Sequence, residues 1–112
     1  MEVTTADKKI EQYAANRSKA VKALGQRRAD KFYERLQDLT DANNLEELRH
    51  VPGHYHELTG TRKGQWACDL DQPYRLIFEP HEDPIPTDPD GKYLWIEIKG
   101  VELIEITNYH GK

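Results

Sequence analysis

Arginine, histidine and tyrosine residues stand at the predicted ends of strands in the second half of the chain. Arg75 lies in an aromatic and aliphatic run, His56 precedes a glycine-rich turn, and Tyr109-His110 follow the last apolar run. An arginine fork suits a phosphate, an imidazole titrates near neutral pH and can transfer protons, and a tyrosine ring can stack on a base. Arg75, His56, Tyr109 and His110 are therefore candidate catalytic residues for chemistry on a phosphodiester.

Each candidate also has a purely structural interpretation. The two histidines could be ordinary surface residues, and the tyrosine an ordinary aromatic at a strand end. An arginine within an apolar strand needs a partner, which could be a carboxylate instead of a phosphate. The carboxylates placed to pair with Arg75 are Asp69, Asp71 and Glu57.

Two pairs of basic residues could contact a nucleic-acid backbone. Arg62-Lys63 lie in a turn between Gly60 and Gly64, and the glycines allow a ligand to approach the backbone closely. Arg27-Arg28 lie in a predicted amphipathic helix, mostly away from its apolar stripe. All four residues are candidate RNA-binding residues.

The chain offers no strong signature of a metal or cofactor site. A zinc site could be imagined from His54, His56, Cys68 and His110, but their spacing matches no compact ligand motif. Cys68 alternates with Trp66 and Leu70, which favours a small buried side chain over a nucleophile. Gly-rich phosphate loops and dinucleotide fingerprints are not found. We expect a protein that works without metal or cofactor.

Length and charge bound the class of protein. A chain of 112 residues predicts a single domain, residues 1–112, and one cysteine excludes an internal disulfide framework. The net charge is −4, yet residues 1–35 hold nine Lys and Arg against five Asp and Glu, whereas residues 76–112 hold three against eight. An RNA surface would therefore be a local basic patch. No signal peptide or apolar run of about 20 residues is seen, so we expect a cytoplasmic protein without a membrane segment.

The residue pattern predicts an α+β fold, in which N-terminal helices pack on a small, mostly antiparallel sheet. The helices are expected over residues 7–24, with a break near Asn16 and a cap at Gly25, and from Gln26 to about Ala42. A short helical turn is expected through Leu45–Leu48. The strands are expected at His54–Thr59, Gln65–Leu70, Tyr74–Glu79 and Val101–Thr107, with a loop at 80–92 and a short strand or helical turn at Tyr93–Lys99. The second and third strands form a hairpin, and the last strand is expected inside the sheet.

The order and spacing of these motifs resemble the HigB-type, plasmid-maintenance killer branch of the RelE/ParE toxin superfamily. Its members show Pro-Gly, then a His–x–Leu stretch leading into a Gly–Asp–Arg–x–Gly–x–Trp turn, an aromatic-Arg strand ending in Phe, and a final strand closing in Asp-Tyr-His. The likeness covers roughly residues 26–110. The matching residues are Leu48, Pro52-Gly53, His56, Leu58, Gly60, Arg62, Gly64, Trp66, Tyr74-Arg75, Phe78 and Tyr109-His110.

The resemblance implies the small α+β toxin fold and metal-independent cleavage of messenger RNA on the ribosome, by attack of a ribose 2′-hydroxyl on the adjacent phosphate. Arg75 would bind that phosphate, His56 and His110 would share the proton transfers, and Tyr109 would orient the base. The implied partners are the ribosome with bound messenger and a HigA-like helix-turn-helix antitoxin. The toxin would be monomeric alone and hetero-oligomeric with its antitoxin.

Three positions depart from the family pattern. Thr59 stands where many members carry Lys, Asp71 where some carry a basic residue, and Asn108 in place of the Asp of Asp-Tyr-His. Together with the acidic balance, these departures keep two alternatives open. One is a non-catalytic inhibitor of DNA gyrase, like the ParE branch, and the other is an inactive relic that serves as a partner of its antitoxin.

Overall fold

The N-terminal helical segment divides at Asn16, as predicted. In the computed structural model, which describes residues 1–108, Asn16 ends α1 (Lys8–Ala15) and caps α2 (Arg17–Leu24). Its side-chain oxygen accepts a hydrogen bond from the backbone N–H of Lys19 at 3.1 Å. Gly25, at φ +87°, then turns the chain from α2 into α3 (Gln26–Asp41).

Within residues 1–108 the sheet has five strands, in the order β1-β5-β4-β3-β2. Its one parallel pair joins β1 and β5, and the other pairs are antiparallel. The predicted hairpin is β3–β4, and the predicted last strand is β5, which lies inside the sheet between β1 and β4. The strands are β1 (Glu2–Thr5), β2 (His56–Glu57), β3 (Trp66–Asp69), β4 (Tyr74–Pro80) and β5 (Gly100–Asn108).

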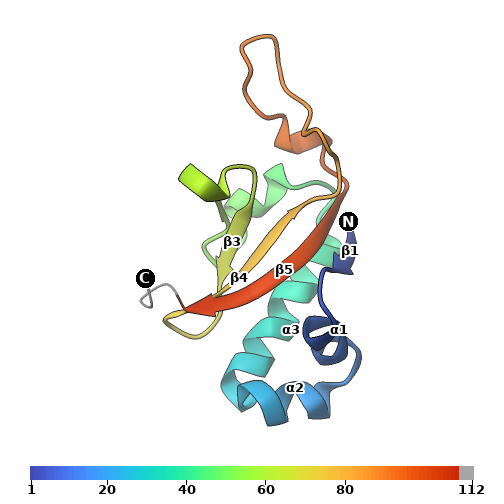
Figure 1. Ribbon diagram of the computed structural model, residues 1–112, viewed down its shortest axis with the longest axis vertical. Helices are drawn as coiled ribbons and strands as arrows, with labels where there is room; N and C mark the ends of the chain where they lie inside the picture. Colours follow the sequence, from blue (N-terminus) through green and yellow to red (C-terminus); the bar gives the residue numbers. More distant parts are fainter. Residues whose placement is uncertain (109–112) are drawn as a thin grey trace.

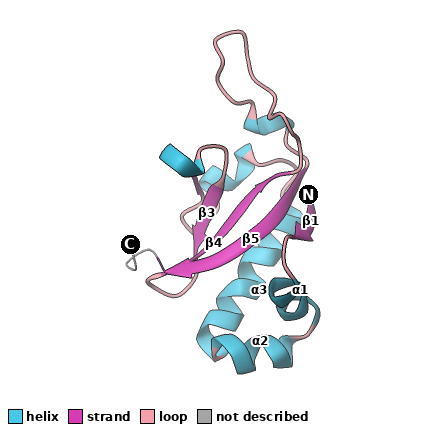
Figure 2. Cartoon of the chain, viewed as in Figure 1, coloured by secondary structure: helices cyan, strands magenta, loops and turns pink. Residues whose placement is uncertain are grey.

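Helices and sheet form two layers, as Figures 1 and 2 show. Phe32 and Leu39 of α3 are fully buried with Trp66, Leu76 and Phe78 of the sheet. Burial of such side chains away from water stabilises the layer pair by about 2 kcal/mol each. The α+β architecture predicted from the sequence is confirmed. Three 3₁₀ turns complete the described elements: η1 (Glu46–His50), η2 (Gly60–Arg62) and η3 (Trp95–Glu97).

The predicted loop after β4 protrudes from the body of the molecule (Figure 1). We call residues 82–94 the arm. A single bridge, Thr87 to Tyr93, pairs its two sides. The chain returns to the sheet through η3, where Trp95 is buried edge-on against Trp66, with ring centroids 5.5 Å apart. The alternative of a helical turn at 93–99 is therefore the one observed.

The face of the sheet that points away from the core carries polar side chains. Arg75 lies opposite Asp69 of β3 and Thr107 of β5. Glu105 lies opposite Ile77, and a bulge between Ile77 and Phe78 then shifts the β4–β5 register, so that Phe78 lies opposite Leu103. This polar face is where the candidate residues of the sheet meet. In the part of the chain that the structure describes, no helix is long and apolar enough to cross a membrane.

Candidate active site

Asp69 links the candidate residues at one end of the polar face. Its carboxylate lies 3.4 Å from Nε of Arg75 and 3.5 Å from Nδ1 of His54. The Asp69 and Arg75 side chains are about four-fifths buried, with 20% and 21% of their area exposed. Of the three carboxylates that could pair with Arg75, Asp69 is the one beside it. The pair is positioned by the ladder, since the two residues are direct partners in β3–β4.

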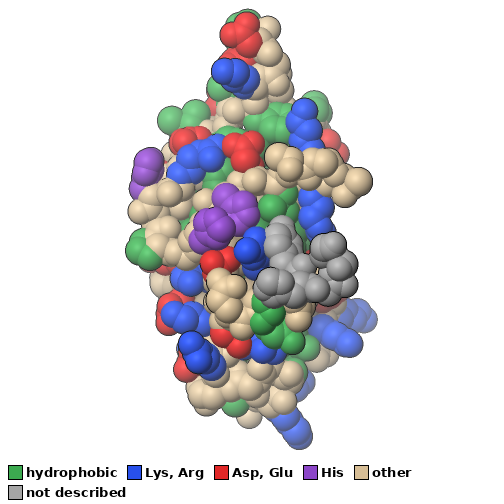
Figure 3. All heavy atoms as spheres, turned by 90° about the vertical axis from the view of Figure 1, so that its left-hand side faces the viewer, with side chains coloured by type: hydrophobic (Ala, Val, Ile, Leu, Met, Phe, Trp, Pro, Cys, Tyr) green, Lys and Arg blue, Asp and Glu red, His purple; other side chains and the backbone are tan. Residues whose placement is uncertain are grey.

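A second histidine extends this cluster. The rings of His54 and His56 stack with centroids 4.1 Å apart and planes 20° apart. Nδ1 of His56 lies 2.8 Å from the carbonyl oxygen of His54. A carbonyl can only accept, so Nδ1 carries the proton and Nε2 is the acceptor of the neutral ring. Figure 3 shows histidine side chains gathered on this face beside acidic and basic groups.

Apart from the conceivable zinc set, no role was predicted for His54, although it joins His56 to Asp69. Its backbone has φ +56°, the left-handed region that non-glycine residues rarely adopt. Strained backbone of this kind collects at functional sites. The stack depends on this local turn, which a spacing of two residues in the sequence does not reveal.

A buried network behind the sheet supports Asp69. Arg35 of α3 donates from Nε to the Asp69 carbonyl oxygen at 2.7 Å, and the Asp69 N–H donates to Gly53 at 2.8 Å. Arg35 also lies 3.7 Å from Asp38, whose carboxylate accepts from the Tyr55 hydroxyl at 2.9 Å. The Asp69 backbone is thus bonded on both sides. The sequence did not indicate this role for Arg35, because the residue lies off the apolar stripe of the predicted helix and resembles an ordinary surface cation.

Cys68 is fully buried beside this network, in agreement with the prediction of a small core side chain. Burial raises the pKa of its thiol well above the ordinary value, because a thiolate would lose its hydration. Burial likewise raises the pKa of the Tyr55 hydroxyl. Both groups are neutral near pH 7, and neither is suited to act as a nucleophile.

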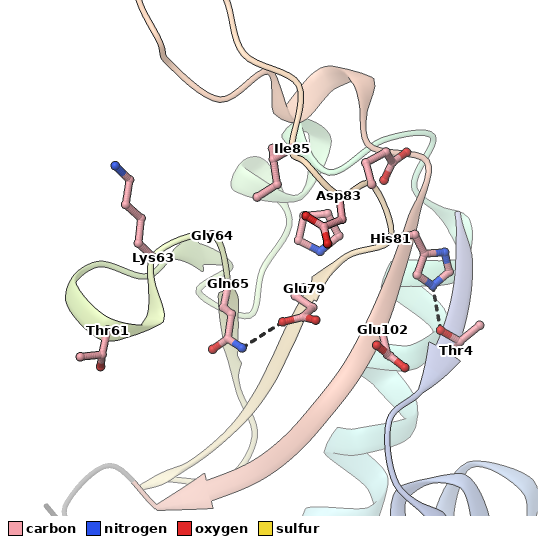
Figure 4. Close-up of a pocket in the computed structure, with 12 residues that line it drawn as sticks. Thr4, Thr61, Lys63, Gly64, Gln65, Glu79, His81, Asp83, Ile85 and Glu102 are labelled. Atoms are coloured by element: carbon pink, nitrogen blue, oxygen red, sulfur yellow. Dashed lines mark hydrogen bonds between the residues drawn. The ribbon is translucent and has the colours of Figure 1, made fainter.

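The predicted RNA-contacting cations differ in their surroundings. Arg62 is held by Glu105 at 2.6 Å and by Gln65 at 2.9 Å, whereas Lys63 lies at the exposed side of the same turn. Gln65 in turn donates to Glu79 at 3.1 Å (Figure 4). The charge of Arg62 is therefore already compensated within the chain.

The two arginines of α3, Arg27 and Arg28, also differ in whether an acidic side chain pairs with them. Arg28 makes two hydrogen bonds to Asp71, at 2.8 and 3.1 Å, and its guanidinium lies 3.5 Å from the centre of the Tyr74 ring. Arg27 is exposed. Asp71, one of the departures from the family pattern, thus fastens the β3–β4 turn to α3.

Tyr109 and His110 lie outside the described residues. The strand that leads to them, β5, is described through Asn108, which pairs with Tyr74. Its neighbour Thr107 pairs with Arg75.

A hollow of about 560 Å³ lies between the polar face and the arm (Figure 4). Its charged lining is mainly acidic: Glu79, Glu82, Asp83 and Glu102, against Lys63 and His81. Nε2 of His81 is hydrogen-bonded to the Thr4 hydroxyl at 2.7 Å. These carboxylates disfavour an anionic substrate, so the hollow does not suit the phosphate that Arg75 could bind. Among residues 1–108, no group of three or more His, Cys, Asp or Glu side chains is arranged to hold a metal ion.

Comparison with known proteins supports the fold assignment. No protein-family model and no curated sequence matches the chain. Among solved structures, it is similar to a YoeB/ParE toxin from Agrobacterium tumefaciens, with 12% sequence identity and a TM-score of 0.53. The match covers 96% of this chain and 98% of the other. The chain therefore shares the fold of that YoeB/ParE toxin.

Proposed function

We propose that this chain is the toxin of a toxin–antitoxin pair and that it cleaves messenger RNA on the ribosome, as a HigB-like member of the RelE/ParE superfamily. The observation that carries the proposal is the cluster of Arg75, Asp69, His54 and His56 on the polar face. It joins a phosphate-binding group to proton-transfer groups on a fold similar to that of a YoeB/ParE toxin.

In this mechanism the ribose 2′-oxygen forms a bond to the adjacent phosphorus, and the bond from phosphorus to the 5′-oxygen breaks. Nε2 of His56 is an acceptor in the neutral ring, so it suits the base that takes the 2′-hydroxyl proton. His110 would then protonate the leaving 5′-oxygen. The products are a 2′,3′-cyclic phosphate and a 5′-hydroxyl, and no metal is needed.

Arg75 would bind the phosphate and stabilise the charge that develops on it. In the free protein Asp69 compensates that guanidinium at 3.4 Å, so substrate phosphate must share Arg75 with a carboxylate. Nδ1 of His54, 3.5 Å from Asp69, is a second neighbour of that carboxylate and can compete with Arg75 for it. Tyr109 would stack on or orient the base.

RNA backbone would be contacted by the exposed Arg27 and Lys63. Arg62 would have to share its charge with Glu105, and Arg28 with Asp71. Few uncompensated cations give weak affinity for free RNA, since that affinity depends on counterion release. The ribosome would supply concentration and orientation of the substrate.

The proposed partners follow from this activity. A HigA-like helix-turn-helix antitoxin would neutralise the toxin in a hetero-oligomer, and the toxin alone would be monomeric. Action on ribosomes places the protein in the cytoplasm.

A second candidate is a non-catalytic inhibitor, such as a ParE-like inhibitor of gyrase, or a toxin relic that only binds its antitoxin. The observation that favours it is the pairing of Arg75 and Arg62 with Asp69 and Glu105. Cations compensated in this way are less available to RNA.

One comparison separates the candidates. Purified protein is incubated with one transcript, with and without ribosomes, and the ends of the fragments are analysed. The nuclease gives cutting only with ribosomes and 2′,3′-cyclic ends. Equal cutting in both tubes contradicts ribosome dependence, and no cutting in either favours the inhibitor or the relic.

A further inference from the structure

A second hollow, of about 440 Å³, lies where η1, β2, the turn after η2 and the arm meet. Sites for small molecules commonly fall in this range of volumes. Its lining differs from that of the acidic hollow, because it combines an aromatic ring with an excess of cations. The residues that matter are Tyr93 and Trp95, the cations Arg49, Lys63 and Lys92, and the carboxylates Glu46 and Glu57.

The ring of Tyr93 is held by a series of edge-on aromatic contacts. It lies 5.0 Å from Trp95 at 63°, and Trp95 lies 5.5 Å from Trp66 at 82°. Trp66 and Trp95 are buried, whereas Tyr93 is only half-buried. Trp95 is also fixed by a hydrogen bond from Nε1 to Glu57 at 3.1 Å. The contacts of Trp95 with Trp66 and Glu57 therefore fix the orientation in which the Tyr93 ring faces the hollow.

The carboxylates of the hollow are already engaged. Arg49 lies 2.9 Å from Glu46 and 2.5 Å from Glu57, and its guanidinium lies over Trp66. Lys63 is 5.7 Å from the centre of the Tyr93 ring, and Lys92 lines the same space. Three cations face two carboxylates, so the hollow suits an anion beside a ring.

We propose that this hollow is a nucleotide-binding subsite for single-stranded RNA. The base stacks on the Tyr93 ring, and Lys63 and Lys92 each contact one of the two phosphates that flank it. Aromatic platforms flanked by cations are the usual means of binding single strands, because every base has a face that can stack. The identification of the strand as RNA rests on the proposed function.

The subsite lies at the sheet edge that also carries the candidate active site. Glu57, which lines the hollow, follows His56 in β2, and the two side chains point to opposite faces of the sheet, since Glu57 pairs with the buried Trp66 and His56 with Ala67. Figure 3 shows histidine side chains near the middle of one face, with acidic and basic side chains around them. An RNA strand held at Arg75 would pass around the β2 edge of the sheet to reach the arm.

The test is calorimetric titration of the full chain at low ionic strength, without ribosomes. The probe is the RNA trinucleotide ApApA, and sodium tripolyphosphate is the control that lacks a base. Tyr93→Leu, which keeps an apolar contact to Trp95, should bind ApApA about tenfold more weakly. Tyr93→Phe should bind like the native chain. Lys63→Gln and Lys92→Gln should each lower the salt slope by about 0.7.

Lys22→Gln, which removes one exposed charge from α2, is the matched control and should change nothing. Thermal melting shows that each variant folds. Unchanged binding of ApApA by Tyr93→Leu, or an equal loss of tripolyphosphate binding in that variant, would overturn the subsite. Binding through Tyr93 by a chain that cuts no messenger would support the subsite and count against the nuclease, so the two proposals can fail separately.

Discussion

The guanidinium of Arg35 donates a hydrogen bond to the carbonyl oxygen of Asp69, with 2.7 Å between Nε and the oxygen. Arg35 belongs to α3, in the helical layer, and only 9% of its area is exposed. Asp69 ends β3 and faces Arg75 and His54 on the other side of the sheet. One buried arginine thus connects the core to the strand end that carries the candidate site.

Replacing Arg35 by Met should destabilise the protein by about 2 kcal/mol. The change removes the bond to Asp69 and leaves Asp38 beside the buried Tyr55 without its cation. We expect less than the full cost of a broken buried pair, because 28% of the Asp38 side chain is exposed. Urea denaturation measures the difference. Arg17→Met is the control, since its exposed pair with Asp30 and its contact with the Tyr33 ring, 4.2 Å from the ring centre, should together contribute about 1 kcal/mol. Equal losses in both variants would contradict the role given to Arg35.

Gly53→Ala should be more destabilising than a glycine replacement elsewhere. A Cβ atom at Gly53 would lie 2.9 Å from the Arg35 guanidinium carbon and 2.9 Å from the Tyr55 ring, at φ +132°. The cost combines backbone strain with a steric clash and should exceed about 2 kcal/mol. Gly91→Ala has a positive φ of +83° but open space around its Cβ, so it isolates the strain at about 1 kcal/mol. Similar midpoints of unfolding for the two variants would mean that the contact with Arg35 does not matter.

Arg75→Ala should abolish growth arrest and ribosome-dependent cleavage, if Arg75 binds the reacting phosphate. Arg75→Lys should recover only part of the activity, because a two-point fork becomes a single point charge. The readouts are growth on induction and cleavage of a transcript on ribosomes. Arg17→Ala, on the far helical layer, should remain fully active. A soluble, folded Arg75→Ala variant that still arrests growth would remove this residue from the mechanism.

The Cys68 thiol should resist alkylation in the native protein. Its folded pKa is raised by burial, so the reactive thiolate is scarce at pH 8, where an exposed cysteine with a pKa of about 8.5 reacts readily. The neutral, buried thiol contributes its full stability below the pKa of the unfolded thiol. As pH rises above that value, the unfolded chain releases its proton first, and the free energy of unfolding falls. Iodoacetamide labelling followed by mass measurement tests this, with urea-unfolded protein as the positive control. Rapid labelling under native conditions would contradict a buried thiol.

Most of the helices and strands can be predicted from residues that are close together in the sequence. The apolar stripe of α3, the glycine that ends α2 and the alternation in β3 and β4 predict the observed elements because each depends on residues close in sequence. The strand β1 was not predicted. Its four residues include one apolar side chain, Val3, which is too little for a recognisable alternation, and it is defined by its parallel pairing with β5.

The candidate site shows the same division. Arg75 and His56 could be chosen by residue type and position, and Asp69 was among the possible partners of Arg75. His54 could not, because its role depends on a left-handed turn and on a ring stack. Nor could the difference between Arg27 and Arg28 be predicted, since Asp71 reaches α3 only when the hairpin packs on it.

Arg27 and Arg28 should therefore respond differently to reversal of their charge. Arg27→Glu should weaken action on ribosomes while leaving stability within about 0.5 kcal/mol, because Arg27 is an exposed cation. Arg28→Glu should cost stability as well, by about 2 kcal/mol. It removes two hydrogen bonds to Asp71 and the contact with the Tyr74 ring, and it places like charges together in a half-buried position. The measurements are urea denaturation and cleavage of one transcript on ribosomes, with cleavage compared at equal folded concentration. Lys22→Glu controls for a change of charge on the helical layer. If Arg27→Glu cuts as well as the native chain, the α3 surface is not a ribosomal contact; if Arg28→Glu is as stable as Arg27→Glu, the Arg28–Asp71 pair does not fasten the hairpin to the helix.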